Sequence, residues 1–182
     1  MSSRIARLVQ AYQRFIELPW ESGLAGAQKV IFAVYDKHDE LKIRANVEEF
    51  ELATRSANHG WRLLDITDAF PQWMAAQEYR EGYFQSPADL QDILKDFTET
   101  VAAHILEELE QADADTVVAL QGVAGVFGFG HCSEIIAKVA GSVQGRLLVL
   151  FPGEYENNNY RLLDARPGWN YLAVPITARN SL

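Results

Sequence analysis

Three short runs that are apolar at all or all but one position constrain the fold of this chain more than any other feature of its sequence. They are residues 30–35 (VIFAVY), 116–120 (TVVAL) and 146–151 (RLLVLF). A run of this length without polar alternation is typical of a strand buried on both faces, as in a parallel sheet covered by helices. We therefore expect these runs to form the centre of a sheet.

Segments with helical spacing lie between the runs. Apolar side chains recur at intervals of three and four residues in the stretches 5–16, 43–54 and 90–109. This spacing predicts helices with one buried face. Ser2 or Ser3 can cap the first helix, and Ser86 followed by Pro87 is a strong start signal for the third. Helices that alternate with strands favour a mainly parallel sheet.

The predicted fold is a three-layer α/β fold with a mainly parallel sheet of about five strands and helices on both faces. Residues 61–66 (WRLLDI) supply a further strand. Residues 160–164, a turn at 166–168 and residues 169–176 are expected to form a C-terminal antiparallel hairpin. No repeat, low-complexity tract or linker interrupts the pattern, so we expect residues 1–182 to form a single α/β domain.

Charge and composition exclude some classes of partner. The chain has 25 acidic and 16 basic residues, a formal net charge of −9. Such a surface repels phosphate backbones, so we expect no direct nucleic-acid binding and a better fit to a basic protein partner. Cys132 is the only cysteine, which fits a reducing compartment such as the cytoplasm. No run approaches the roughly 20 apolar residues that span a bilayer, so no membrane contact is expected.

A glycine-spaced loop, residues 122–130 (GVAGVFGFG), lies between a predicted strand and a predicted helix. Phosphate-binding loops occupy this position because backbone N–H groups and the helix dipole converge there. The lysine and hydroxyl residue of a Walker motif are replaced by His131 and Cys132, and the dinucleotide fingerprint is also incomplete. A structural or interface loop is favoured, and a degenerate nucleotide-binding domain stays open as an alternative. Adjacent residues on a helix point about 100° apart, so His131 and Cys132 are not expected to act as a nucleophile pair.

Carboxylates that follow predicted strands give a second alternative, a metal-dependent nuclease or phosphodiesterase. The residues are Asp36, Asp65, Asp68 and Glu154. Carboxyl ends of parallel strands share one edge of a sheet, where such groups can converge on a metal. This alternative predicts at least three carboxylates within about 5 Å of a common point. A helix cap at Asp68 and solvated loop ends elsewhere are the simpler interpretation. With no complete catalytic motif, we expect no enzyme activity, metal or cofactor.

The most unusual segment is residues 151–171 (FPGEYENNNYRLLDARPGWNY), which concentrates amides, aromatics and charges. Asparagine side chains fix turns, whereas tyrosine, tryptophan and arginine are favoured anchors of interfaces. Two interpretations stay open: a loop whose charges pair internally, and a surface that recognises a partner. The candidate partner-binding residues are Glu154, Tyr155, Asn157, Asn158, Asn159, Tyr160, Arg161 and Trp169.

This segment, continued as FPGEYENNNYRLLDARPGWNYLAVPI, resembles the end of the BrxB family, the small component of bacterial BREX phage-defence systems. RIARLVQAYQRFIELPW, VIFAVYDKHDE and TVVALQGVAGVFGFGHCSEII agree with it, so the resemblance covers nearly the whole chain. It implies a non-enzymatic adaptor in a complex that restricts phage DNA, with the alkaline-phosphatase-like PglZ protein as direct partner. The BREX ATPase and, more remotely, the methyltransferase would be its neighbours. The resemblance implies no catalytic residue.

Overall fold

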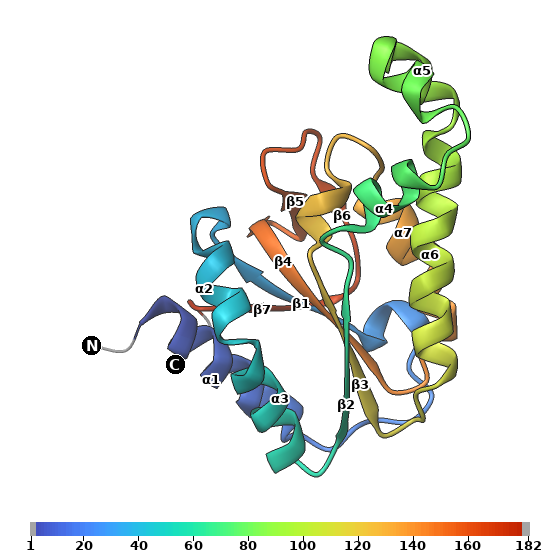
Figure 1. Cartoon of the computed structure of the whole chain (residues 1–182). Coiled ribbons are helices and arrows are strands. Elements are labelled where there is room, and N and C mark those ends of the chain that lie inside the picture. The colour runs from blue at the N-terminus through green and yellow to red at the C-terminus, as the bar shows by residue number, and fades with distance from the viewer. Residues whose placement is uncertain (1–2, 180–182) are drawn as a thin grey trace.

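The computed structural model describes residues 3–179, which contain one seven-stranded sheet with helices on both faces (Figure 1). The order β2-β3-β4-β1-β7 is parallel throughout, and β5 and β6 extend it with antiparallel pairs. The strands are β1 (Val30–Tyr35), β2 (Gly60–Asp65), β3 (Thr116–Gln121), β4 (Arg146–Glu156), β5 (Asn159–Leu162), β6 (Trp169–Asn170) and β7 (Val174–Thr177). The predicted three-layer α/β class is confirmed.

The helices form two layers on opposite faces of the sheet. Helices α1, α2 and α3 cover one face, and α4, α6 and α7 cover the other (Figure 1). The helices are α1 (Arg4–Ile16), α2 (Glu40–Ala45), α3 (Val47–Ser56), α4 (Ala69–Ala75), α5 (Arg80–Gln85), α6 (Leu94–Glu110) and α7 (Cys132–Val139). Short 3₁₀ helices occupy Gly26–Lys29, Lys37–Asp39, Pro87–Asp92, Val123–Val126 and Ala140–Ser142. Among residues 3–179, no helix is both long and apolar enough to cross a membrane.

The central strand β1 is apolar throughout because its side chains enter two different cores. Ile31, Ala33 and Tyr35 pack toward α1 and α3, whereas the alternate residues pack toward α6 and α7. All six residues are buried. Strand residues point alternately to the two faces, so a strand covered on both sides has no position for a solvated side chain. The uninterrupted apolar run predicted from the sequence follows directly from this arrangement.

Helix α1 is fixed to α3 by a buried hydrogen bond as well as by apolar packing. The fully buried Tyr12 hydroxyl lies 2.6 Å from Thr54 Oγ1, which itself donates to the Phe50 carbonyl at 2.8 Å. Since the Thr54 proton is used in that second bond, the Tyr12 hydroxyl is the donor in the first. The apolar face of α1 is thus packed on the chain's own core. At its N-terminus, Ser3 Oγ accepts the Ala6 N–H at 3.1 Å, and Ser2 lies outside the described residues.

Replacing Thr54 with valine should lower the free energy of unfolding by about 1–3 kcal/mol, because the buried Tyr12 hydroxyl loses its acceptor. The double variant Tyr12→Phe/Thr54→Val should be more stable than Thr54→Val alone, since it removes both polar partners. Urea unfolding followed by circular dichroism measures both effects. A Thr54→Val midpoint equal to that of the wild type would contradict the assignment.

Two predicted helices differ from the structure for local reasons. The helix expected through residues 43–54 is divided at Asn46, whose side chain donates to the Lys42 carbonyl at 2.7 Å and whose φ is −122°. Asparagine competes in this way with the helical hydrogen bonds of the backbone. The start signal at Ser86 and Pro87 opens a 3₁₀ helix, and α6 begins only at Leu94. Pro87 lies in the first turn of this tighter helix, but the Ser86 side chain makes no capping hydrogen bond.

Candidate functional site

Strand β4 continues beyond the carboxyl edge of the parallel sheet and turns back on itself. Its pairing with β1 ends at Pro152, after which residues 153–156 pair antiparallel with β5. Asn157 and Asn158 form the turn with φ values of 51° and 63°, a region that asparagine tolerates better than most residues. The stretch between β4 and β5 is therefore the tip of a hairpin that the sequence did not predict. The predicted antiparallel pairing of residues 160–164 with 169–176 is confirmed in its first part, because β5 pairs with β6.

The rest of the C-terminal segment also departs from the predicted single strand. Residues 169–170 form β6, which pairs with β5, whereas residues 174–177 form β7 and join β1 in parallel. The C-terminal segment thus contributes to both the antiparallel extension and the parallel edge. Figure 1 shows β5 and β6 beyond the ends of the central strands, between α2 and α7. The loops that follow β1 and β3 leave toward opposite faces of the sheet, and β4 lies between these two strands. Open α/β sheets commonly bind ligands at such a point.

The base of the hairpin is anchored in the core by Tyr160. Its side chain is 1% exposed, its hydroxyl donates to the Ala173 carbonyl at 2.9 Å, and its ring lies 4.5 Å from that of Phe32. The half-buried Trp169 ring packs against the same phenylalanine at 5.5 Å. Gly153 allows β5 to approach, since a Cβ there would collide with the Arg161 carbonyl. Of the candidate residues, Tyr160 and Trp169 therefore support the hairpin from beneath.

The remaining candidate residues lie at or near its surface. Glu154 pairs with Arg161 across the two strands at 3.2 Å, and the Tyr155 hydroxyl donates to Asn158 Oδ1 at 2.9 Å. Glu154 and the asparagines at 157–159 are exposed. Arg161 Nε is buried and finds no acceptor among the described residues. The side chains thus pair within the hairpin, and those of Glu154 and the three asparagines also face solvent.

A cavity of about 950 Å³ lies beside the hairpin. It is walled by the start of α6, the glycine loop with the start of α7, and the loop at 164–170. The lining includes Leu94, Phe127, Phe129, Phe151, Arg166 and Trp169. Lys37 Nζ donates to Oδ1 of Asp164, a residue of the cavity wall, at 2.7 Å. The structure therefore brings together two segments that the sequence singled out separately, residues 122–130 and 151–171.

The glycine loop itself is packed more than it is open. Gly122 has a φ of 87°, and a Cβ there would collide with Thr67 in the loop after β2. Val123 and Val126 are buried, and the Phe129 ring stacks on Phe70 at 3.6 Å between centroids. Only the second half of the loop faces the cavity. This placement agrees with the structural or interface role favoured from the sequence.

Cys132 opens α7 as a buried residue, and His131 before it is exposed. Burial raises the pKa of the Cys132 thiol to about 12, so the thiolate is scarce at neutral pH. We expect Cys132 to react with Ellman's reagent at pH 8 only after denaturation, with no measurable reaction in the folded chain on the same time scale. Reaction of the folded chain as fast as that of the denatured chain would contradict this burial.

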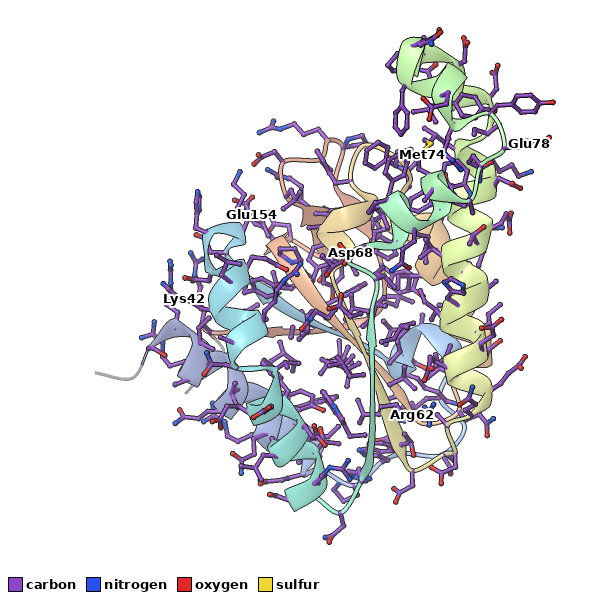
Figure 2. All side chains as sticks on the ribbon, in the orientation of Figure 1. Lys42, Arg62, Asp68, Met74, Glu78 and Glu154 are labelled. Carbon is purple, nitrogen blue, oxygen red and sulfur yellow. The ribbon has the colours of Figure 1, made fainter. Side chains whose placement is uncertain are left out.

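The four carboxylates of the nuclease alternative do not converge. Asp36 follows β1 and Asp65 ends β2, and these strands are separated by β3 and β4, so strand spacing places the two residues roughly 14 Å apart. Asp68 precedes α4, whereas Glu154 lies on the hairpin (Figure 2). Within residues 3–179 no group of three or more histidine, cysteine or acidic side chains is placed to hold a metal. The convergence that this alternative predicts is not found.

Asp65 instead belongs to a polar network that the sequence did not reveal. Burial alone would raise its pKa, but hydrogen bonds from Thr67 and Gln121 outweigh burial, and the pKa lies below its usual range. Farther along the edge, the Tyr35 hydroxyl donates to Glu40, which pairs with Arg44 at 2.8 Å. These bonds occupy polar groups along the carboxyl edge of the sheet. Tyr35 and Gln121 are the last residues of their strands. Their polar side chains at the ends of apolar runs are the sequence signal that could have indicated the network.

The fold and the site define a three-layer α/β protein with a protruding hairpin beside an open, aromatic-walled cavity. A family model described as "BREX protein BrxB" matches residues 63–175. This match covers more than half of the chain, including the hairpin, the cavity walls and α5. The chain therefore belongs to the BrxB family and is a component of a BREX phage-defence system. No curated protein and no solved structure matches it.

Proposed function

We propose that the chain is a non-enzymatic assembly subunit that binds the PglZ component of a BREX complex in the cytoplasm. The proposed contact is the hairpin of β4 and β5 together with the adjoining cavity. Membership of the BrxB family supports a role within a multi-protein complex. The BREX ATPase and methyltransferase are the proposed neighbours of the pair, and the chain is proposed to act as one α/β domain.

The observation that carries the proposal is the way the candidate residues are held. Tyr160 is buried and bonded to Ala173, so the hairpin that bears Glu154 and the asparagines rests on a fixed base. A surface that is ordered before binding loses little conformational entropy on association. The aromatic-walled cavity beside it can take an apolar side chain of the partner, as hot-spot pockets do.

Several features support an adaptor in preference to an enzyme. The Cys132 thiol is buried, and Asp65 already accepts hydrogen bonds from Thr67 and Gln121. The net charge of −9 favours attraction to a basic protein surface over attraction to DNA. Together these features support the interpretation that the chain contributes surface and not chemistry.

A charge swap across the hairpin tests the proposal. The wild-type chain should co-elute with its cognate PglZ in size-exclusion chromatography at low and moderate salt. Glu154→Arg/Arg161→Glu keeps an ion pair across the strands but reverses the charges that the partner meets, so affinity should fall by about tenfold or more. The thermal midpoint of this variant should fall only slightly, because the swap keeps an ion pair between exposed Glu154 and half-buried Arg161, and such pairs near the surface contribute little to stability.

The matched control is Glu51→Arg/Arg55→Glu, which swaps a similarly half-exposed ion pair on α3 and should bind PglZ normally. Failure of the wild-type chain to co-elute would remove the proposed function. Normal binding by the hairpin swap would move the contact away from the hairpin.

A further inference from the structure

Residues 75–92 project from the body of the molecule, and we refer to them as the arm. Trp73 and Met74 of α4 are the last buried side chains before it. From residue 75 to residue 92 no side chain is fully buried, and the arm includes α5 and the 3₁₀ helix Pro87–Asp92. Figure 1 shows α5 beyond the end of α6, away from both helical layers. The arm therefore adds little to the core of the fold.

The arm is nevertheless held in one conformation by hydrogen bonds within it. Arg80 Nη1 donates to the Ala75 carbonyl at 3.0 Å, and the Ser86 N–H donates to the Gly82 carbonyl at 2.9 Å. Half-buried Tyr83 and Leu90 pack against the core and fix its base. A segment held by its own hydrogen bonds presents its outer side chains in a fixed arrangement, which lowers the entropic cost of docking.

Two aromatic side chains of the arm are left in solvent. Tyr79 is 70% exposed and Phe84 is 64% exposed. Tyrosine and phenylalanine are enriched where protein interfaces are buried, because each ring covers a large area at low entropic cost. Glu78, an exposed acid of the arm, is labelled in Figure 2 together with Met74 just before the arm. The arm thus combines exposed rings with exposed acids.

The charge of the arm decides what kind of surface can cover it. Its acids are Glu78, Glu81, Asp89 and Asp92, against the single base Arg80. The Arg80 guanidinium is already engaged by the Ala75 carbonyl and lies 4.0 Å from Glu81. Phosphate backbones and anionic lipids would be repelled, and so would a second copy of a chain with a net charge of −9. A basic protein surface is the complementary partner.

We propose that the arm docks its two exposed rings into a groove of a partner protein that is apolar at its floor and lined with lysine or arginine at its rim. The inference rests on the proposed function, and it adds a second contact to the hairpin: the partner is taken to be PglZ. The arm leads through Ile93 into Leu94, which lines the cavity beside the hairpin, so the base of the arm adjoins the other proposed contact.

The first experiment removes the two exposed rings. The double variant Tyr79→Ser/Phe84→Ser should bind cognate PglZ about tenfold more weakly or worse, measured as Kd by biolayer interferometry. Leu41→Ser/Leu52→Ser is the matched control, because these apolar side chains are 80% and 61% exposed on α2 and α3. The control should bind within about twofold of the wild type. Neither variant alters a buried side chain, so both should fold.

The second experiment reverses the charge of two acids on residues 75–92. Glu78→Lys/Glu81→Lys should weaken binding strongly at low salt and much less at high salt, because screening removes the electrostatic part. Glu48→Lys/Glu49→Lys makes the same change in charge at exposed positions of α3 and should have little effect. Loss of binding that does not depend on salt would argue against a basic rim.

The possible failures are distinguishable. If the wild-type chain binds PglZ and both arm variants bind equally well, the arm is not a contact and the proposed function stands. If the wild-type chain does not bind PglZ, both proposals fall. If light scattering finds a wild-type dimer that becomes monomeric in Tyr79→Ser/Phe84→Ser, a second copy covers the arm and the inference is overturned.

Discussion

The pairing of β4 with β1 is the interaction on which the rest of the structure depends. Six consecutive pairs, Val30 with Leu147 through Tyr35 with Pro152, join two strands that are buried on both faces. Strand β4 has 11 residues and β1 has 6, so β4 must leave the sheet at its carboxyl edge. Its exposed backbone groups then need partners, and β5 supplies them. The hairpin, the position of Tyr160 and one wall of the cavity all follow from this difference in length.

The buried strands were predictable from the sequence because their two-sided burial leaves a local signal. The run at 30–35 coincides with β1, and the runs at 116–120 and 146–151 lie within β3 and β4. The end of β4 was not predictable in the same way. Pro152 and Gly153 indicate a stop locally, but they mark the change of partner from β1 to β5, which depends on residues elsewhere in the fold. Asn157 and Asn158 did predict a turn, and only its role as a hairpin tip was missed.

The candidate site likewise has some features that the sequence predicted and others that depend on the fold. Sequence composition pointed to residues 151–171, but it did not separate the buried anchor Tyr160 from exposed Glu154, since that distinction requires the packing of Phe32 and Ala173 around the ring. The cavity joins segments about 30 residues apart and has no local signature. The arm was missed because Ser86 and Pro87 indicate a helix start, which led us to expect a continuous helix packed on the sheet. The carboxylates failed to converge because β2 lies at the far edge from β1, a strand order that spacing alone does not determine.

The central claim is that this BrxB-family chain acts by presenting two surfaces, the hairpin and the arm, to PglZ. Hydrogen–deuterium exchange of the chain, free and with a saturating amount of its cognate PglZ, tests it most directly. The account predicts slower exchange on binding in residues 153–162 and 75–92, with little change in α1 and α3 on the opposite face. Protection confined to α1 and α3, with none in the hairpin or the arm, would contradict it.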